Sequence, residues 1–133
     1  MNATAVETAE DASDAEVLRY EKAFRETRRV IDESIRNLAI LEEYEENADS
    51  KQQLDLQRST LERDRSNLVR VNIAFHTNQA TMAPPSPDLV AAITELSAQA
   101  VKLTVDSATA AATLRLATAA LNKFAEIQDI ASG

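Results

Sequence analysis

Residues 89–124 read LVAAITELSAQAVKLTVDSATAAATLRLATAALNKF. Apolar or small side chains recur in this stretch at alternating spacings of three and four, with one polar interruption at Ser107. The positions are Leu89, Ile93, Leu96, Ala100, Leu103, Ser107, Ala110, Leu114, Ala117, Leu121 and Phe124. A repeat that averages 3.5 residues turns one narrow seam of an α-helix toward a partner helix. The stretch therefore predicts one long helix, over about residues 87–130, with coiled-coil-like packing.

A second apolar stripe lies on the opposite side of this predicted helix when each residue is rotated by about 100°. Its members are Val90, Val101, Val105, Ala112, Leu116 and Ile127. A helix with apolar stripes on opposite sides is expected to bury both of them. Because this helix is longer than either of the others predicted below, we expect the second stripe to be an interface between subunits. The many alanines of the same region favour close helix packing.

The first helix is predicted over about residues 14–47. Ser13 and Glu16 have the spacing of a capping box, which satisfies free backbone N–H groups at a helix start. One apolar face follows at helical spacing, and the remaining faces are charged. The face consists of Val17, Tyr20, Phe24, Thr27, Ile31, Ile35, Leu38 and Leu41.

A second helix is predicted over about residues 51–80. Its leucines recur at seven from Leu54, out of phase with the first helix, and Asn47, Asp49 and Ser50 favour caps and turns. Ser50 and Gln53 also have capping-box spacing. We therefore expect a helical hairpin, and the competing interpretation is one continuous rod.

The loop over residues 81–87 gives the clearest boundary. Ser86 is a good cap, Pro87 suits the first helical position, and Asp88 favours the first turn. The three prolines lie together in this loop, and the only glycine is Gly133. A sheet protein needs glycine or proline at many separate turns, so this composition disfavours a sheet. The expected fold is all-α: a three-helix antiparallel bundle, or a helical hairpin plus one long C-terminal helix. We expect one domain, residues 14–133, after a disordered acidic tail, residues 1–13.

Composition narrows the classes of function. The 133-residue chain has no cysteine, which excludes disulfide frameworks and thiol chemistry, and its formal net charge is −8. That charge disfavours nucleic acid and anionic lipid, since both are bound through clustered Lys and Arg. No segment has the pattern of a secretory signal or a transmembrane helix, so we expect a cytoplasmic protein and consider membrane insertion unfavourable.

No group of residues indicates catalysis. The acidic run of residues 42–46, EEYEE, has the residue types of a metal site or a partner-binding patch. Consecutive helical residues point apart, however, which favours a solvated helix end beside a turn. His76 is the only histidine and is interpreted as structural or exposed. Arg25, Arg28 and other arginines alternate with acids, as on a solvated face. We expect no enzyme activity, metal, cofactor or small-molecule substrate.

The most favoured function is therefore a non-catalytic helical interaction or assembly module. It would self-associate through the long C-terminal helix or bind another helical protein. The alternative is an amphipathic helical protein that binds a lipid, membrane or granule surface, as pore-forming or coat proteins do. Such proteins usually carry a basic or neutral polar face, which this acidic chain lacks.

Overall fold

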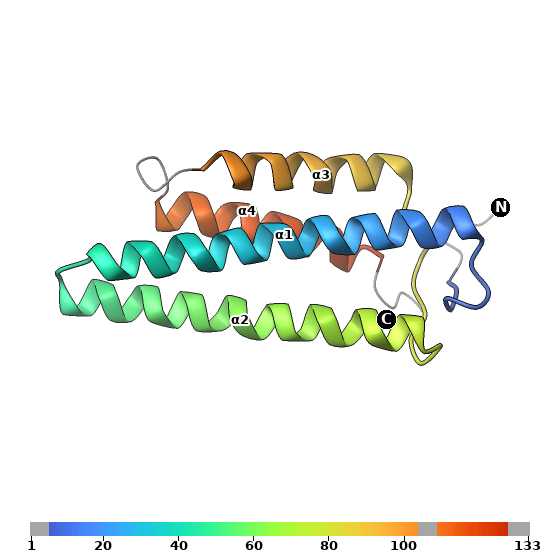
Figure 1. The fold of residues 1–133 in the computed structure, drawn as a ribbon, viewed down its shortest axis with the longest axis horizontal. Coiled ribbons are helices and arrows are strands. Elements are labelled where there is room, and N and C mark those ends of the chain that lie inside the picture. The colour runs from blue at the N-terminus through green and yellow to red at the C-terminus, as the bar shows by residue number, and fades with distance from the viewer. Residues whose placement is uncertain (1–5, 104–108, 128–133) are drawn as a thin grey trace.

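The computed structural model describes residues 6–103 and 109–127. This part of the chain forms four α-helices, α1 (Asp14–Tyr44), α2 (Ala48–His76), α3 (Pro87–Lys102) and α4 (Ala110–Ala125). They run up, down, up and down in a bundle, with α1 in the middle of the view in Figure 1. α1 packs along all three of the other helices. The all-α prediction is confirmed.

The hairpin of the first two helices is present, and the continuous rod is excluded. α1 ends at Tyr44, and Asn47 caps α2, because its Oδ1 accepts a hydrogen bond of 2.9 Å from the Ser50 N–H. The cap is therefore Asn47 and not Ser50. At its other end α2 stops at His76, short of residue 80, since Asn78 adopts a left-handed φ of 61° that a helix cannot continue.

The prediction of one long helix over residues 87–130 is wrong. α3 ends at Lys102, where Leu103 has an extended ψ of 116°, and α4 starts after Thr109, whose hydroxyl accepts from the Ala112 N–H at 3.0 Å. The sequence between them is rich in Thr, Val, Asp and Ser, which are weaker helix formers than Ala or Leu. α4 runs antiparallel to α3, so both halves pack within one subunit (Figure 1).

The buried apolar residues form three clusters along the bundle. At the end that carries the residue 77–86 loop, the Tyr20 ring lies 4.2 Å from that of Phe75 and 5.9 Å from that of Phe124, measured between centroids. Leucines and isoleucines of α1 and α2 fill the other end, covered by Ala117 of α4. Burial of each large side chain stabilises the fold by about 1.5 to 3 kcal/mol.

Small residues line the contact of α1 with α3 and α4. Ala23, Ala100 and Ala120 are each at most 2% exposed, which agrees with the close packing expected from the alanines. The buried hydroxyls of Thr27 and Ser34 donate to carbonyls one turn earlier in α1, both at 2.7 Å. Both hydroxyls therefore find their hydrogen-bond partners within α1 and need none from a neighbouring helix.

The described part of the expected N-terminal tail, residues 6–13, makes hydrogen bonds to the loop before α3. Glu7 and Met82 exchange two backbone hydrogen bonds, of 2.8 and 2.7 Å. The Glu10 N–H donates to Asn78 Oδ1 at 2.9 Å. Residues 6–13 thus lie against the loop before α3 and lead directly into the Ser13 cap, while residues 1–5 lie outside the described residues.

Candidate interaction site

The six residues of the predicted subunit interface occupy different environments. Val90, Leu116 and Ile127 are 8%, 7% and 2% exposed, so they belong to the core of a single subunit. Ala112 is half-buried, Val101 is 52% exposed, and Val105 lies outside the described residues. Three of the six residues therefore pack within one subunit, and the structure does not bring the six together on one exposed surface.

A groove runs between α1 and α2 on the outside of the bundle. Its volume is about 340 Å³. We call it the α1–α2 groove; it is lined by Glu21, Phe24, Arg25, Arg28, Asn72 and His76. Phe24 is half-buried at this site and its ring lies 6.4 Å from that of Phe124, so the groove has an aromatic base joined to the core.

The groove opens where ion pairs between the two helices are missing. Toward the hairpin turn, Arg65 Nη1 lies 3.2 Å from Asp32 Oδ1. Toward the other end, His76 Nε2 lies 3.4 Å from Glu21 Oε1. Among the described residues no ion pair joins α1 to α2 between these two. α2 has no acidic residue from 65 to 76, so no carboxylate of α2 faces Arg25 there.

The groove is lined by two arginines and one carboxylate, that of Glu21, whose Oε1 lies against His76. Arg25 makes no ion pair with any described residue, and Arg28 is held only by an exposed contact of 3.7 Å with Asp32. Asn72 contributes a buried Oδ1 that has no hydrogen-bond partner in the described part of the chain. Arginine binds carboxylates and also stacks on aromatic rings, so the groove suits an aromatic side chain flanked by acids.

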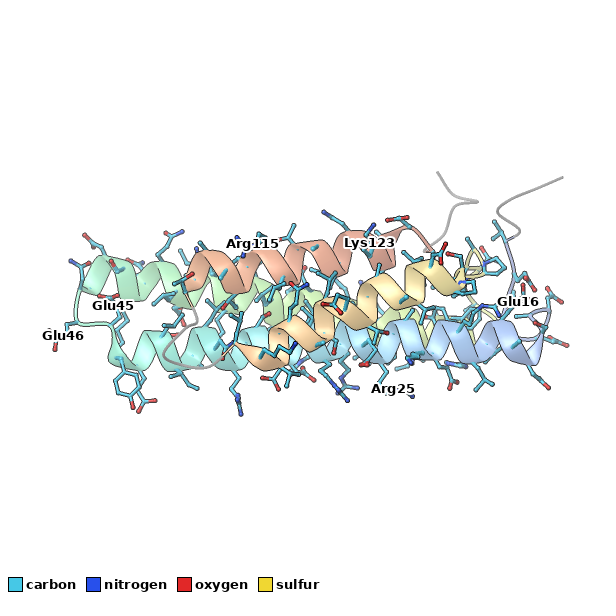
Figure 2. All side chains as sticks on the ribbon, turned by 90° about the horizontal axis from the view of Figure 1, so that it is seen from above. Glu16, Arg25, Glu45, Glu46, Arg115 and Lys123 are labelled. Atoms are coloured by element: carbon cyan, nitrogen blue, oxygen red, sulfur yellow. The ribbon has the colours of Figure 1, made fainter. Side chains whose placement is uncertain are left out.

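The far end of the hairpin is acidic. We call residues 42–47 the hairpin tip, and Tyr44 within it is 74% exposed. Figure 2 shows Glu45 and Glu46 at this end, with Arg25 on the flank of α1 well away from them. The acidic run therefore lies at a helix end beside a turn, as expected from the sequence.

One carboxylate of the tip is already engaged. Glu42 Oε2 lies 3.0 Å from Arg58 Nε, and the same guanidinium contacts Asp55 at 2.7 Å and Glu62 at 3.2 Å. The hydrogen bond to Glu42 is the largest cause of a raised pKa at Arg58. This network joins α1 to α2 at the tip and holds the hairpin turn in place.

A small cavity of about 10 Å³ lies under the N-terminal segment, beside Tyr20. Burial raises the pKa of the Tyr20 phenol, whose oxygen has no described hydrogen-bond partner. Partial burial and a hydrogen bond with Glu16 raise the pKa of Glu7, whereas hydrogen bonds from Ser13 lower the pKa of Glu16. The cavity is too small for any substrate larger than water.

The described residues hold neither a cluster of metal ligands nor a membrane-spanning helix. They contain no group of three or more His, Cys, Asp or Glu placed to hold a metal ion. None of their helices combines the length and the apolar character needed to cross a membrane. No family model, curated protein or solved structure matches the chain.

Proposed function

We propose that this chain is a non-catalytic assembly module whose subunits associate through the α1–α2 hairpin. One observation carries the proposal: the hairpin bears opposite charges at two separate places, a groove with unmatched arginine and a tip with exposed glutamates. Surfaces of opposite charge steer subunits together and fix their orientation. The chain as a whole carries a net charge of −8, so its composition does not lead one to expect a surface groove with more arginine than acid.

The hairpin takes the place of the C-terminal helix in this proposal. α3 and α4 direct their apolar seams inward, and Val101 is the one member of the second stripe known to be largely exposed. A single exposed valine is normal on a protein surface and indicates no interface. The hairpin, in contrast, offers an aromatic residue and charges at both of its sites.

Absolute mass measured by light scattering at two protein concentrations tests the proposal. At about 0.1 M salt, where charges interact over about 10 Å, the mass should rise with protein concentration. At about 1 M salt, where the screening length is about 3 Å, it should return toward that of the monomer. A monomer at every concentration and both salt levels contradicts the assembly function.

A further inference from the structure

We infer that the subunits join head to tail, with the hairpin tip of one copy seated in the α1–α2 groove of the next. The inference rests on the proposed function and names the contact through which the assembly forms. The occupant of the groove is therefore a second copy of this chain, and the argument for it is chemical complementarity between two sites on one hairpin.

The two sites match in both charge and residue type. Tyr44 is the most exposed of the large hydrophobic residues in the described part of the chain, and glutamates precede and follow it. The groove offers the half-buried ring of Phe24 with Arg25 and Arg28 beside it. A tyrosine that enters the groove contacts the ring and the guanidinium groups, while its neighbouring carboxylates reach the arginines.

The charges needed for this contact are free in the single subunit. Glu42 is held by Arg58, and Glu45 Oε1 accepts from the Asn47 N–H at 3.1 Å. Glu43 and Glu46 are exposed and form no ion pair with the described residues, which is also true of Arg25. The tip therefore has two available carboxylates, and the groove has an available guanidinium.

The contact has to form between different molecules. Arg25 and Glu43 lie on the same straight helix, separated by about 27 Å at a rise of 1.5 Å per residue, so a subunit cannot fill its own groove. A two-fold pairing of groove against groove would set Arg25, which has no ion-pair partner among the described residues, against its own copy, and it would leave the tip carboxylates unused. A head-to-tail contact avoids this repulsion and builds rings or open chains.

Two variants, each defective at one site, test the inference. The tip variant carries Glu43→Gln with Tyr44→Ala, and the groove variant carries Arg25→Glu. Removing one exposed charge pair should weaken association up to about fivefold, and loss of the aromatic contact should add about two- to tenfold. At protein concentrations close to the wild-type dissociation constant, each variant alone should therefore be mostly monomeric, the tip variant more so because it loses both contributions.

Mixing the two variants gives the decisive result. The groove variant keeps an intact tip, the tip variant keeps an intact groove, and together they can form a single contact. The mixture should show a heterodimer by light scattering and nothing larger. Arg115→Glu is the matched control, because Figure 2 places Arg115 on α4 at the opposite edge of the bundle from Arg25, and this variant should associate like the wild type.

Circular dichroism checks that each variant is folded, and Arg28→Glu serves as the groove variant if Arg25→Glu is not. A wild type that associates while both variants also associate fully overturns the head-to-tail contact and leaves the proposed function standing. Weakened variants that do not form a heterodimer on mixing overturn it as well, since they indicate a symmetric interface or another occupant of the groove. A monomeric wild type overturns both.

Discussion

Tyr20→Phe should stabilise this protein, although it removes a polar group from a well-packed aromatic cluster. Tyr20 is 1% exposed, and its ring lies 4.2 Å from that of Phe75. The hydroxyl oxygen is buried without a hydrogen-bond partner in the described residues. Phenylalanine keeps the ring contacts and removes only this oxygen, so the substitution isolates the free energy of one buried hydroxyl.

The size of the effect follows from two opposing contributions. A buried polar group without a partner costs about 1 to 3 kcal/mol, and the substitution removes that penalty. The void left by one oxygen costs a few tenths of a kcal/mol, at about 24 cal/mol per Å³. We expect a net gain of about 1 kcal/mol, which raises the melting temperature of a domain of this size by about 4 °C.

A bound water is the alternative that the experiment distinguishes. The neighbouring cavity of about 10 Å³ is at the lower limit for one water molecule. Its lining is mostly apolar, and its two carboxyl groups, Glu7 and Glu16, already hydrogen-bond to each other, whereas a buried water needs two to four free polar partners. We therefore expect the cavity to be dry and the hydroxyl to be unpaired.

Thermal and urea unfolding followed by circular dichroism measure the difference. Protein and salt concentrations should be held where the chain is monomeric, because association raises the apparent stability. Tyr44→Phe is the matched control: Tyr44 is 74% exposed, and its substitution should change the free energy of unfolding by less than about 0.5 kcal/mol. A Tyr20→Phe protein that melts below the wild type would refute the reasoning and indicate a hydroxyl bonded to water.

Two further predictions concern burial and pH. Leu116→Asp places a carboxylate in the core between α1, α3 and α4 and should cost more than about 3 kcal/mol, seen as loss of helical circular dichroism. Val101→Asp, at a position 52% exposed, should change stability by less than about 0.5 kcal/mol; similar effects of the two would contradict the inward packing of α4. Glu7→Gln should raise the melting temperature at neutral pH. The pKa of Glu7 is raised in the folded state, so the ionised carboxylate destabilises the fold when the pH is above that pKa, and glutamine cannot ionise. The advantage should vanish at a pH well below 4.5, the ordinary pKa of glutamate, because Glu7 is then protonated in both the folded and the unfolded state. The exposed Glu10→Gln is the charge-matched control; equal gains for both variants at neutral pH would indicate an effect of net charge alone.

The starts of two helices could be predicted because their signals are local. Ser13 Oγ accepts from the Glu16 N–H at 3.2 Å, and Glu16 Oε1 accepts from the Ser13 N–H at 2.9 Å, which is the capping box read from their spacing. Ser86 and Pro87 begin α3 in the same way. Such signals involve neighbours in sequence, so tertiary packing leaves them unchanged.

The reversal between α3 and α4 could not be predicted from the hydrophobic pattern. The connection over residues 103–109 spans one heptad, so the apolar seam keeps its phase across it. Both short helices turn that same seam toward the core: Ile93 and Ala100 are buried in α3, as are Ala117 and Phe124 in α4. The hydrophobic repeat shows only which side of a helix is apolar. It is the same for one continuous helix and for two antiparallel helices that turn this side toward a common core.

The groove was missed for a different reason. Arg25 and Arg28 were interpreted as part of a solvated face of mixed charge, which is correct for a single helix. Their unmatched charge appears only when α1 is paired with α2 in a defined register. The available sequence signal was the run of α2 from 65 to 76 without an acidic residue, and it has meaning only once the partner helix is known.

The central position of α1 also sets how the molecule opens. α2 is attached chiefly through α1, whereas α3 and α4 contact α1 and each other. If α2 detaches, α1, α3 and α4 still pack together. If α1 detaches, α2 loses the helix through which it is attached, and the other helices no longer share a core. Amide hydrogen exchange should then be slowest around Val30 and Ile31, which exchange only when the whole subunit unfolds. The outer helix that forms half of the groove can loosen while the rest of the bundle holds together.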